Sequence, residues 1–71
     1  MFVNKLTDKD VYEILYLHKI KKLQPHEIAE SFPVTKQTIK SIVAGKSRKD
    51  CYFAFIDYME NHPRKVKTLF R

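Results

Sequence analysis

Residues 27–49, EIAESFPVTKQTIKSIVAGKSRK, decide the predicted fold because they read as two short helices with a tight connection. Apolar residues recur at helical spacing on both sides of Pro33, which cannot continue a helix. Thr35 fits the N-cap of the second helix, and Gly45 fits the left-handed position that follows a helix end. The sequence therefore predicts helices over about residues 25–32 and 36–44.

Two further helices flank this pair in the prediction. Thr7 and Asp10 form a candidate capping box for a helix over about residues 8–22. Either Ser47 or Asp50 is expected to cap a helix over about 48–61, which stops before a proline. The expected fold class is all-α, a small bundle of about four helices with a three-helix core and a C-terminal helix.

Length and composition agree with one small helical domain. The chain has 71 residues, of which 44% are hydrophobic, and only one glycine for tight turns. We expect a single domain over residues 1–62 and a basic tail over 63–71, which lacks periodicity and is expected to be mobile. The apolar run at 51–56 is far shorter than the roughly 20 residues of a membrane span. With a single cysteine and no secretion pattern, the expected location is the cytoplasm.

The net charge of +6 is concentrated in two blocks. No acidic residue follows Glu30 until Asp50, whereas five lysines or arginines lie between residues 36 and 49. Four more bases and no acid lie in the tail. This pattern favours a polyanionic partner, most simply a phosphate backbone, over the alternative of a solvated surface that keeps the protein soluble.

The two short helices at 25–32 and 36–44 have the lengths and the separation of a helix-turn-helix. Such helices cross at close range, and Ala29 supplies the small residue that the contact requires. The remaining side of the second helix is polar, and a helix presented in this way fits the major groove of DNA.

The motifs E-I-A at 27–29, V-T at 34–35, T-I at 38–39 and I-x-x-G at 42–45 carry a family resemblance. Residues 6–48 resemble the helix-turn-helix domains of small bacterial and phage DNA-binding regulators, including resolvase-type domains and the modules appended to phage HNH endonucleases. The resemblance implies sequence-specific binding to double-stranded DNA by a small transcriptional regulator. It places recognition on Thr35, Lys36, Gln37, Lys40 and Ser41.

Pro33 departs from this family pattern, because many such domains have a glycine with a positive φ at this position. The turn is therefore expected to be built differently, with Phe32 extended ahead of the proline.

The candidate DNA contacts fall into two groups. Base contacts are expected from Lys36, Gln37, Lys40 and Ser41, since glutamine pairs with adenine and lysine donates to guanine. Phosphate contacts are expected from Thr35, Thr38, Lys46, Ser47, Arg48 and Lys49. Thr35 is explained equally well as a helix cap, and the tail bases either follow the DNA backbone or remain in solvent.

The helix at 48–61 is apolar nearly all round, which predicts burial on more than one side. One interpretation is a homodimer through this helix, with an interface formed by Tyr52, Phe53, Phe55, Ile56, Tyr58 and Met59. The other is that the helix closes the small core of the monomer.

A second class of function remains open at the level of sequence. The chain is alternatively a protein-interaction module on the same scaffold, binding transcription machinery or a recombinase. His18, His26 and His62 with Cys51 match no zinc-ligand spacing, so no metal and no cofactor are expected. No nucleophile–base pair or phosphate loop is recognisable, and the chain is not expected to be an enzyme.

Overall fold

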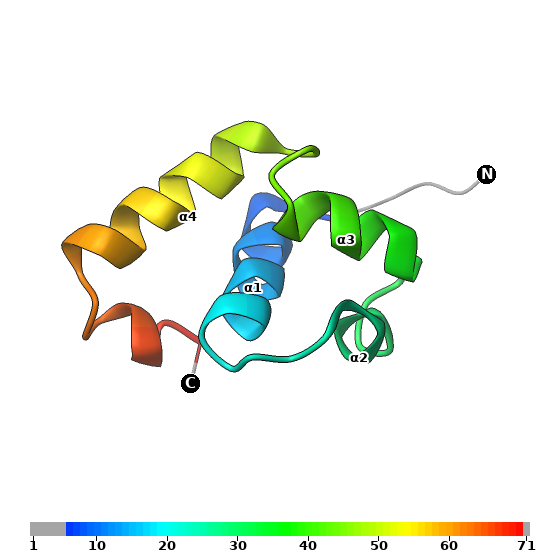
Figure 1. Cartoon of the computed structure of the whole chain (residues 1–71), viewed down its shortest axis with the longest axis horizontal. Helices are drawn as coiled ribbons and strands as arrows, with labels where there is room; N and C mark the ends of the chain where they lie inside the picture. Colours follow the sequence, from blue (N-terminus) through cyan, green and yellow to red (C-terminus); the bar gives the residue numbers. More distant parts are fainter. Residues whose placement is uncertain (1–5, 71) are drawn as a thin grey trace.

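The computed structural model describes residues 6–70, and every regular element within that range is helical (Figure 1). The elements are α1 (Asp8–Lys19), α2 (Pro25–Ala29), α3 (Lys36–Val43), α4 (Lys49–Asn61) and a short 3-10 helix, η1 (Val66–Thr68). The prediction of an all-α bundle of four helices is confirmed, although α1 and α2 each end three residues earlier than predicted.

α1 begins at the predicted capping box. The Thr7 hydroxyl accepts the Asp10 amide at 3.1 Å, and the Asp10 carboxylate accepts the Thr7 amide at 3.1 Å. The helix ends where Lys22 adopts a left-handed conformation with φ 64°, and the Leu23 amide donates to the Leu17 carbonyl across this turn. Local hydrogen bonds therefore fix both ends of α1.

α2 and α3 are joined by a turn that contains no residue with a positive φ. The Gln24 amide donates to the Glu27 carboxylate at 2.8 Å, and Pro25 occupies the first helical position, as predicted. The Thr35 hydroxyl accepts the Thr38 amide at 3.3 Å and so caps α3. The turn at Pro33 is thus made without the left-handed residue that glycine commonly supplies.

α3 ends in a Schellman motif at Gly45, whose φ is 80°. The Lys46 amide donates to the Ser41 carbonyl at 3.0 Å, and the Gly45 amide donates to the Ile42 carbonyl at 3.1 Å. A Cβ at Gly45 would lie 3.0 Å from the Tyr52 ring, so both the backbone and the packing require glycine here.

The predicted cap of α4 is wrong. Neither Ser47 nor Asp50 caps this helix; its N-cap is Arg48, in a left-handed conformation with φ 54° and no side-chain cap bond. The tight reversal after Gly45 leaves only three residues before α4, and the Arg48 side chain is drawn back to the start of α1 instead.

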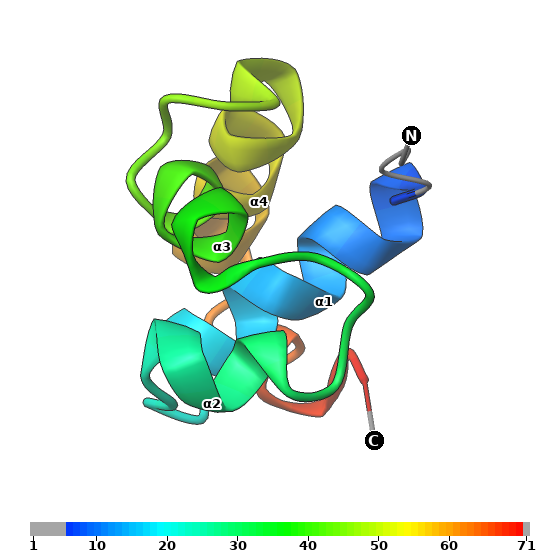
Figure 2. The same cartoon turned by 90° about the vertical axis from the view of Figure 1, so that its right-hand side faces the viewer.

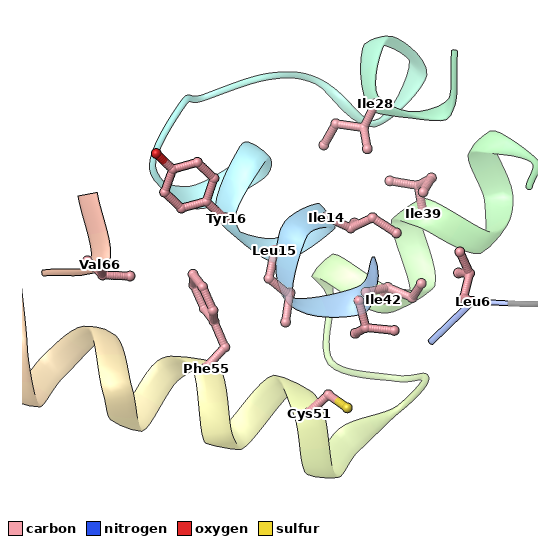
Figure 3. Packing of buried hydrophobic residues seen from close by; sticks show 11 residues of the cluster. Leu6, Ile14, Leu15, Tyr16, Ile28, Ile39, Ile42, Cys51, Phe55 and Val66 are labelled. Atoms are coloured by element: carbon pink, nitrogen blue, oxygen red, sulfur yellow. The ribbon is translucent and has the colours of Figure 1, made fainter. Parts of the chain in front are cut away.

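The core is centred on α1, which contacts α2, α3 and α4 (Figure 2). Ile14 and Leu15 of α1 are completely buried, and side chains from the other helices converge on them (Figure 3). These are Ile28 of α2, Ile39 and Ile42 of α3, and Cys51 and Phe55 of α4. Each helix therefore has its position set by its apolar residues on α1.

Residues 63–70 are folded against α1, in contrast to the mobile tail that the sequence predicted. Val66 is only 1% exposed, the Tyr16 hydroxyl donates to the Lys67 carbonyl at 2.7 Å, and the Phe70 ring meets the Tyr16 ring edge-on at 5.4 Å. A single turn of 3-10 helix is too short to show periodicity in sequence, so the pattern gave no sign of this packing.

Replacing Val66 with alanine tests this docking. The substitution removes two buried methyl groups and should lower the free energy of unfolding by about 2 kcal/mol, measured by chemical denaturation. Lys65→Ala, an exposed neighbour, is the control and should have little effect. Equal stability of the two variants would contradict the packing of this segment in solution.

Candidate nucleic-acid interface

α3 has one apolar side, which is buried, and one polar side, which is largely exposed. Ile39 and Ile42 are buried, whereas Lys36, Gln37 and Lys40 are exposed. Helical spacing brings these three polar side chains onto one side of α3, with the half-buried Ser41 at its margin. The structure thus gathers the four residues predicted to contact bases.

The two threonines at the start of α3 are occupied by capping. The Thr35 hydroxyl oxygen accepts the Thr38 amide, and the two hydroxyl oxygens lie 3.3 Å apart. The capping interpretation of Thr35 is confirmed by this geometry. Thr35 is nevertheless exposed, whereas Thr38 is half-buried.

The segment that follows α3 carries the remaining predicted phosphate contacts. Lys46 and Lys49 are exposed, and Ser47 is half-buried with its amide donating to the Ser41 carbonyl at 3.2 Å. Lys46 directly follows the Gly45 turn, so the turn geometry holds its backbone close to the end of α3. This segment and α3 form one continuous stretch without acidic residues.

Arg48 is placed differently from its predicted role as a phosphate contact. Its Nη1 donates to the Leu6 carbonyl at 3.1 Å, and its Nη2 lies 2.6 Å from the Asp8 carboxylate. The guanidinium thus ties the α3–α4 connection to the start of α1. Both terminal nitrogens of the guanidinium are thus bonded to protein oxygens, while the side chain stays partly exposed.

Asp8 also accepts the Cys51 thiol at 3.5 Å. The hydrogen bond from Arg48, followed by that from Cys51, holds the pKa of Asp8 below its usual value. Burial, with the Asp8 hydrogen bond as a smaller cause, raises the pKa of Cys51, so this thiol stays protonated and unreactive at neutral pH.

A third basic group lies at the end of α1 and was missed as a site by sequence reasoning. Lys19 Nζ lies 5.5 Å from the centre of the Tyr52 ring, and Tyr52 in turn packs against Gly45. Lys19 and Lys22 line a hollow together with His18, Leu23, Gln24 and Met59. The sequence did contain a signal for this group, since three lysines lie within four residues. Lysines are common at the C-terminal end of a helix, however, because they interact favourably with the helix dipole, so they did not indicate a binding site.

The residues predicted to form an interface on α4 do not share one environment. Phe55 is 2% exposed and belongs to the monomer core, so its assignment to an interface is corrected. Phe53 is 62% exposed. Tyr52, Ile56, Tyr58 and Met59 are half-buried. Tyr58 lines an apolar hollow of about 280 Å³ with Tyr12, Ala54, Phe55 and Leu69.

Across residues 6–70, no cluster of three or more His, Cys, Asp or Glu side chains is arranged to hold a metal ion. In the same part of the chain, no helix has the length and apolar character needed to cross a membrane. Comparisons with models of known families, with curated proteins and with solved structures each give no match for this chain.

The ion pair between Asp8 and Arg48 predicts a pH-dependent contribution to the free energy of unfolding. Because the folded-state pKa of Asp8 is lowered, its contribution is present above the usual value of 3.8 and is lost as the pH falls through the folded-state pKa. Asp8→Asn should therefore lower the free energy of unfolding at pH 7, and the difference from the unchanged protein should shrink below pH 3.8.

Asp50→Asn is the matched control, since Asp50 also lies in a first helical turn but has no ion pair among the described residues. Urea denaturation across this pH range measures both variants. An Asp8→Asn effect that is equal at all pH values would contradict a role for the charged carboxylate.

Proposed function

We propose that this protein binds double-stranded DNA in a sequence-specific manner and acts as a small transcriptional regulator. In this proposal α2 and α3 form a helix-turn-helix, and α3 enters the major groove. The observation that carries the proposal is the exposed polar side of α3, formed by Lys36, Gln37 and Lys40, in a stretch without acidic residues from residue 31 to residue 49.

The rigidity of α3 supports this role. Two buried isoleucines fix its inner side, the Thr35 cap fixes its start, and the Gly45 turn fixes its end. Side chains that read bases must be held in a defined geometry, and a helix anchored at both ends provides it. In Figure 2 α3 is viewed nearly along its axis, with α2 below it and α4 behind, so one side of the helix has no neighbouring element.

Positively charged side chains close to α3 also support binding to phosphate groups. Lys46 follows the helix, and Lys19 and Lys22 lie beyond Tyr52, which packs on the same turn. We assign base contact to Lys36, Gln37, Lys40 and Ser41, and phosphate contact first to Lys46. Arg48 has a positioning role instead, because Asp8 and the Leu6 carbonyl already occupy its guanidinium.

DNA binding predicts a strong dependence of affinity on salt. Fluorescence anisotropy with a random duplex, titrated from about 50 to 200 mM salt, should show affinity falling by orders of magnitude. Lys46→Ala should reduce the slope of log affinity against log salt by about one unit without altering sequence preference. Lys65→Ala is the control and should leave the slope unchanged, because the connection between α4 and η1 that contains Lys65 lies at the end of the molecule away from α3 (Figure 1). Absence of binding at low salt would overturn the proposal.

Sequence preference should depend on Gln37 and Lys36. After selection of a target from a random duplex library, Gln37→Ala should lower discrimination against a changed base pair by about 1–3 kcal/mol. The double variant Lys36→Ala with Gln37→Ala should bind all duplexes nearly equally. Circular dichroism confirms that the variants remain folded. An unchanged preference in the double variant would exclude α3 as the reading helix.

A second candidate, a protein-interaction module on the same scaffold, is favoured by the apolar hollow beside α4 and by the exposed Phe53. Replacing Lys36, Lys40 and Lys46 with glutamine separates the two. If the protein is a DNA-binding regulator, this variant should lose DNA binding while its fold stays intact. If it is a protein-interaction module, the variant should still bind its protein partner.

A further inference from the structure

The outer side of α4 carries four residues with the spacing of a coiled-coil seam. Lys49, Phe53, Ile56 and Glu60 follow one another at intervals of four, three and four residues. Lys49, Phe53 and Glu60 are exposed and Ile56 is half-buried. Helical geometry directs these four residues, the α4 stripe, away from the buried Cys51 and Phe55. In Figure 1 α4 runs along the edge of the molecule with α1 on its inner side. The core covers part of Ile56, and the other three residues of the stripe are exposed.

The α4 stripe is complementary to itself when a second helix runs in the opposite direction. Lys49 and Glu60 lie at equal distances on either side of the midpoint between residues 54 and 55, and so do Phe53 and Ile56. Two antiparallel copies related by a two-fold axis at that midpoint would therefore place each residue level with its complement.

We propose that the α4 stripe is the contact surface for a second copy of this chain in an antiparallel helix pair. Lys49 of each copy pairs with Glu60 of the other, and Phe53 of each copy packs on Ile56 of the other. A parallel pair would instead place lysine against lysine and glutamate against glutamate, so charge selects the antiparallel arrangement. The arrangement also covers Phe53, which is 62% exposed in the monomer.

This assignment refines the interface that the composition of α4 suggested. Tyr52, Tyr58 and Met59 pack against the monomer core and flank or oppose the seam, and Phe55 lies inside the core. Ile56 also packs partly against the core, so only the remaining part of its side chain is available to a second copy. Lys49 is assigned to the second copy and not to DNA phosphate. A single helix pair lies below the roughly 1,200 Å² of a standard interface, so the dimer is expected to be weak and dependent on protein concentration.

The inference does not depend on DNA binding, and charge reversal tests it without DNA. Sedimentation equilibrium from about 10 µM to 1 mM should show dimers of the unchanged protein. Lys49→Glu places carboxylates opposite each other at both ends of the pair, and Glu60→Lys places ammonium groups there. Each substitution should weaken self-association by at least about tenfold.

The decisive sample is an equimolar mixture of the Lys49→Glu and Glu60→Lys proteins. Both ends of a mixed pair are again complementary, so the mixture should form heterodimers at concentrations where neither protein dimerises alone. This recovery also shows that both variants are folded. Lys65→Glu and Glu30→Lys make the same charge changes elsewhere on the exposed surface and should leave dimerisation unchanged.

Three results would overturn the proposal. The first is an unchanged protein that stays monomeric up to about 1 mM. The second is dimerisation that survives both single charge reversals. The third is a mixture of the two variants that remains monomeric.

Discussion

Burial of the apolar side of α1 is the constraint on which the rest of the structure depends. A chain of 71 residues has room for one small core, and Ile14 and Leu15 lie at its centre. α2, α3, α4 and the segment around Val66 each contribute one or a few side chains to this centre. α2 and α3 also contact each other directly, so their orientation is set both by this mutual packing and by their contacts with α1. The direction in which α3 presents its polar side is therefore set by contacts made on the opposite side of that helix.

Local signals in the sequence were sufficient to predict the helices and most of their ends. Thr7, Thr35 and Gly45 each act through hydrogen bonds or backbone angles within a few residues, and the structure confirms all three. The polar side of α3 was equally predictable, because the spacing of Ile39 and Ile42 fixes which residues point outward.

Most of the features that the sequence did not predict depend on contacts between distant residues. Arg48 turns back to Asp8 across forty positions, and Tyr16 is joined to Lys67 across fifty-one. Phe55 was assigned to an interface because composition alone does not show which side of an apolar helix meets the core. The position of Lys19 over Tyr52 likewise follows from the packing of α4 on the Gly45 turn.

Among residues 6–70, three backbone positions are left-handed, and they differ in the side chains that they accept. Gly45 has no space for a side chain beside Tyr52, whereas Lys22 and Arg48 adopt similar φ values with full side chains. A left-handed conformation costs a residue other than glycine about 1 kcal/mol. This strain is present at both Lys22 and Arg48, because the only glycine in the sequence lies at position 45. Lys22 thus carries positive charge where glycine would relieve strain, whereas glycine at Arg48 would relieve the same strain but remove the contacts with Asp8 and the Leu6 carbonyl. For anyone engineering this scaffold, Lys22 is therefore the position where a positive charge can be exchanged for stability.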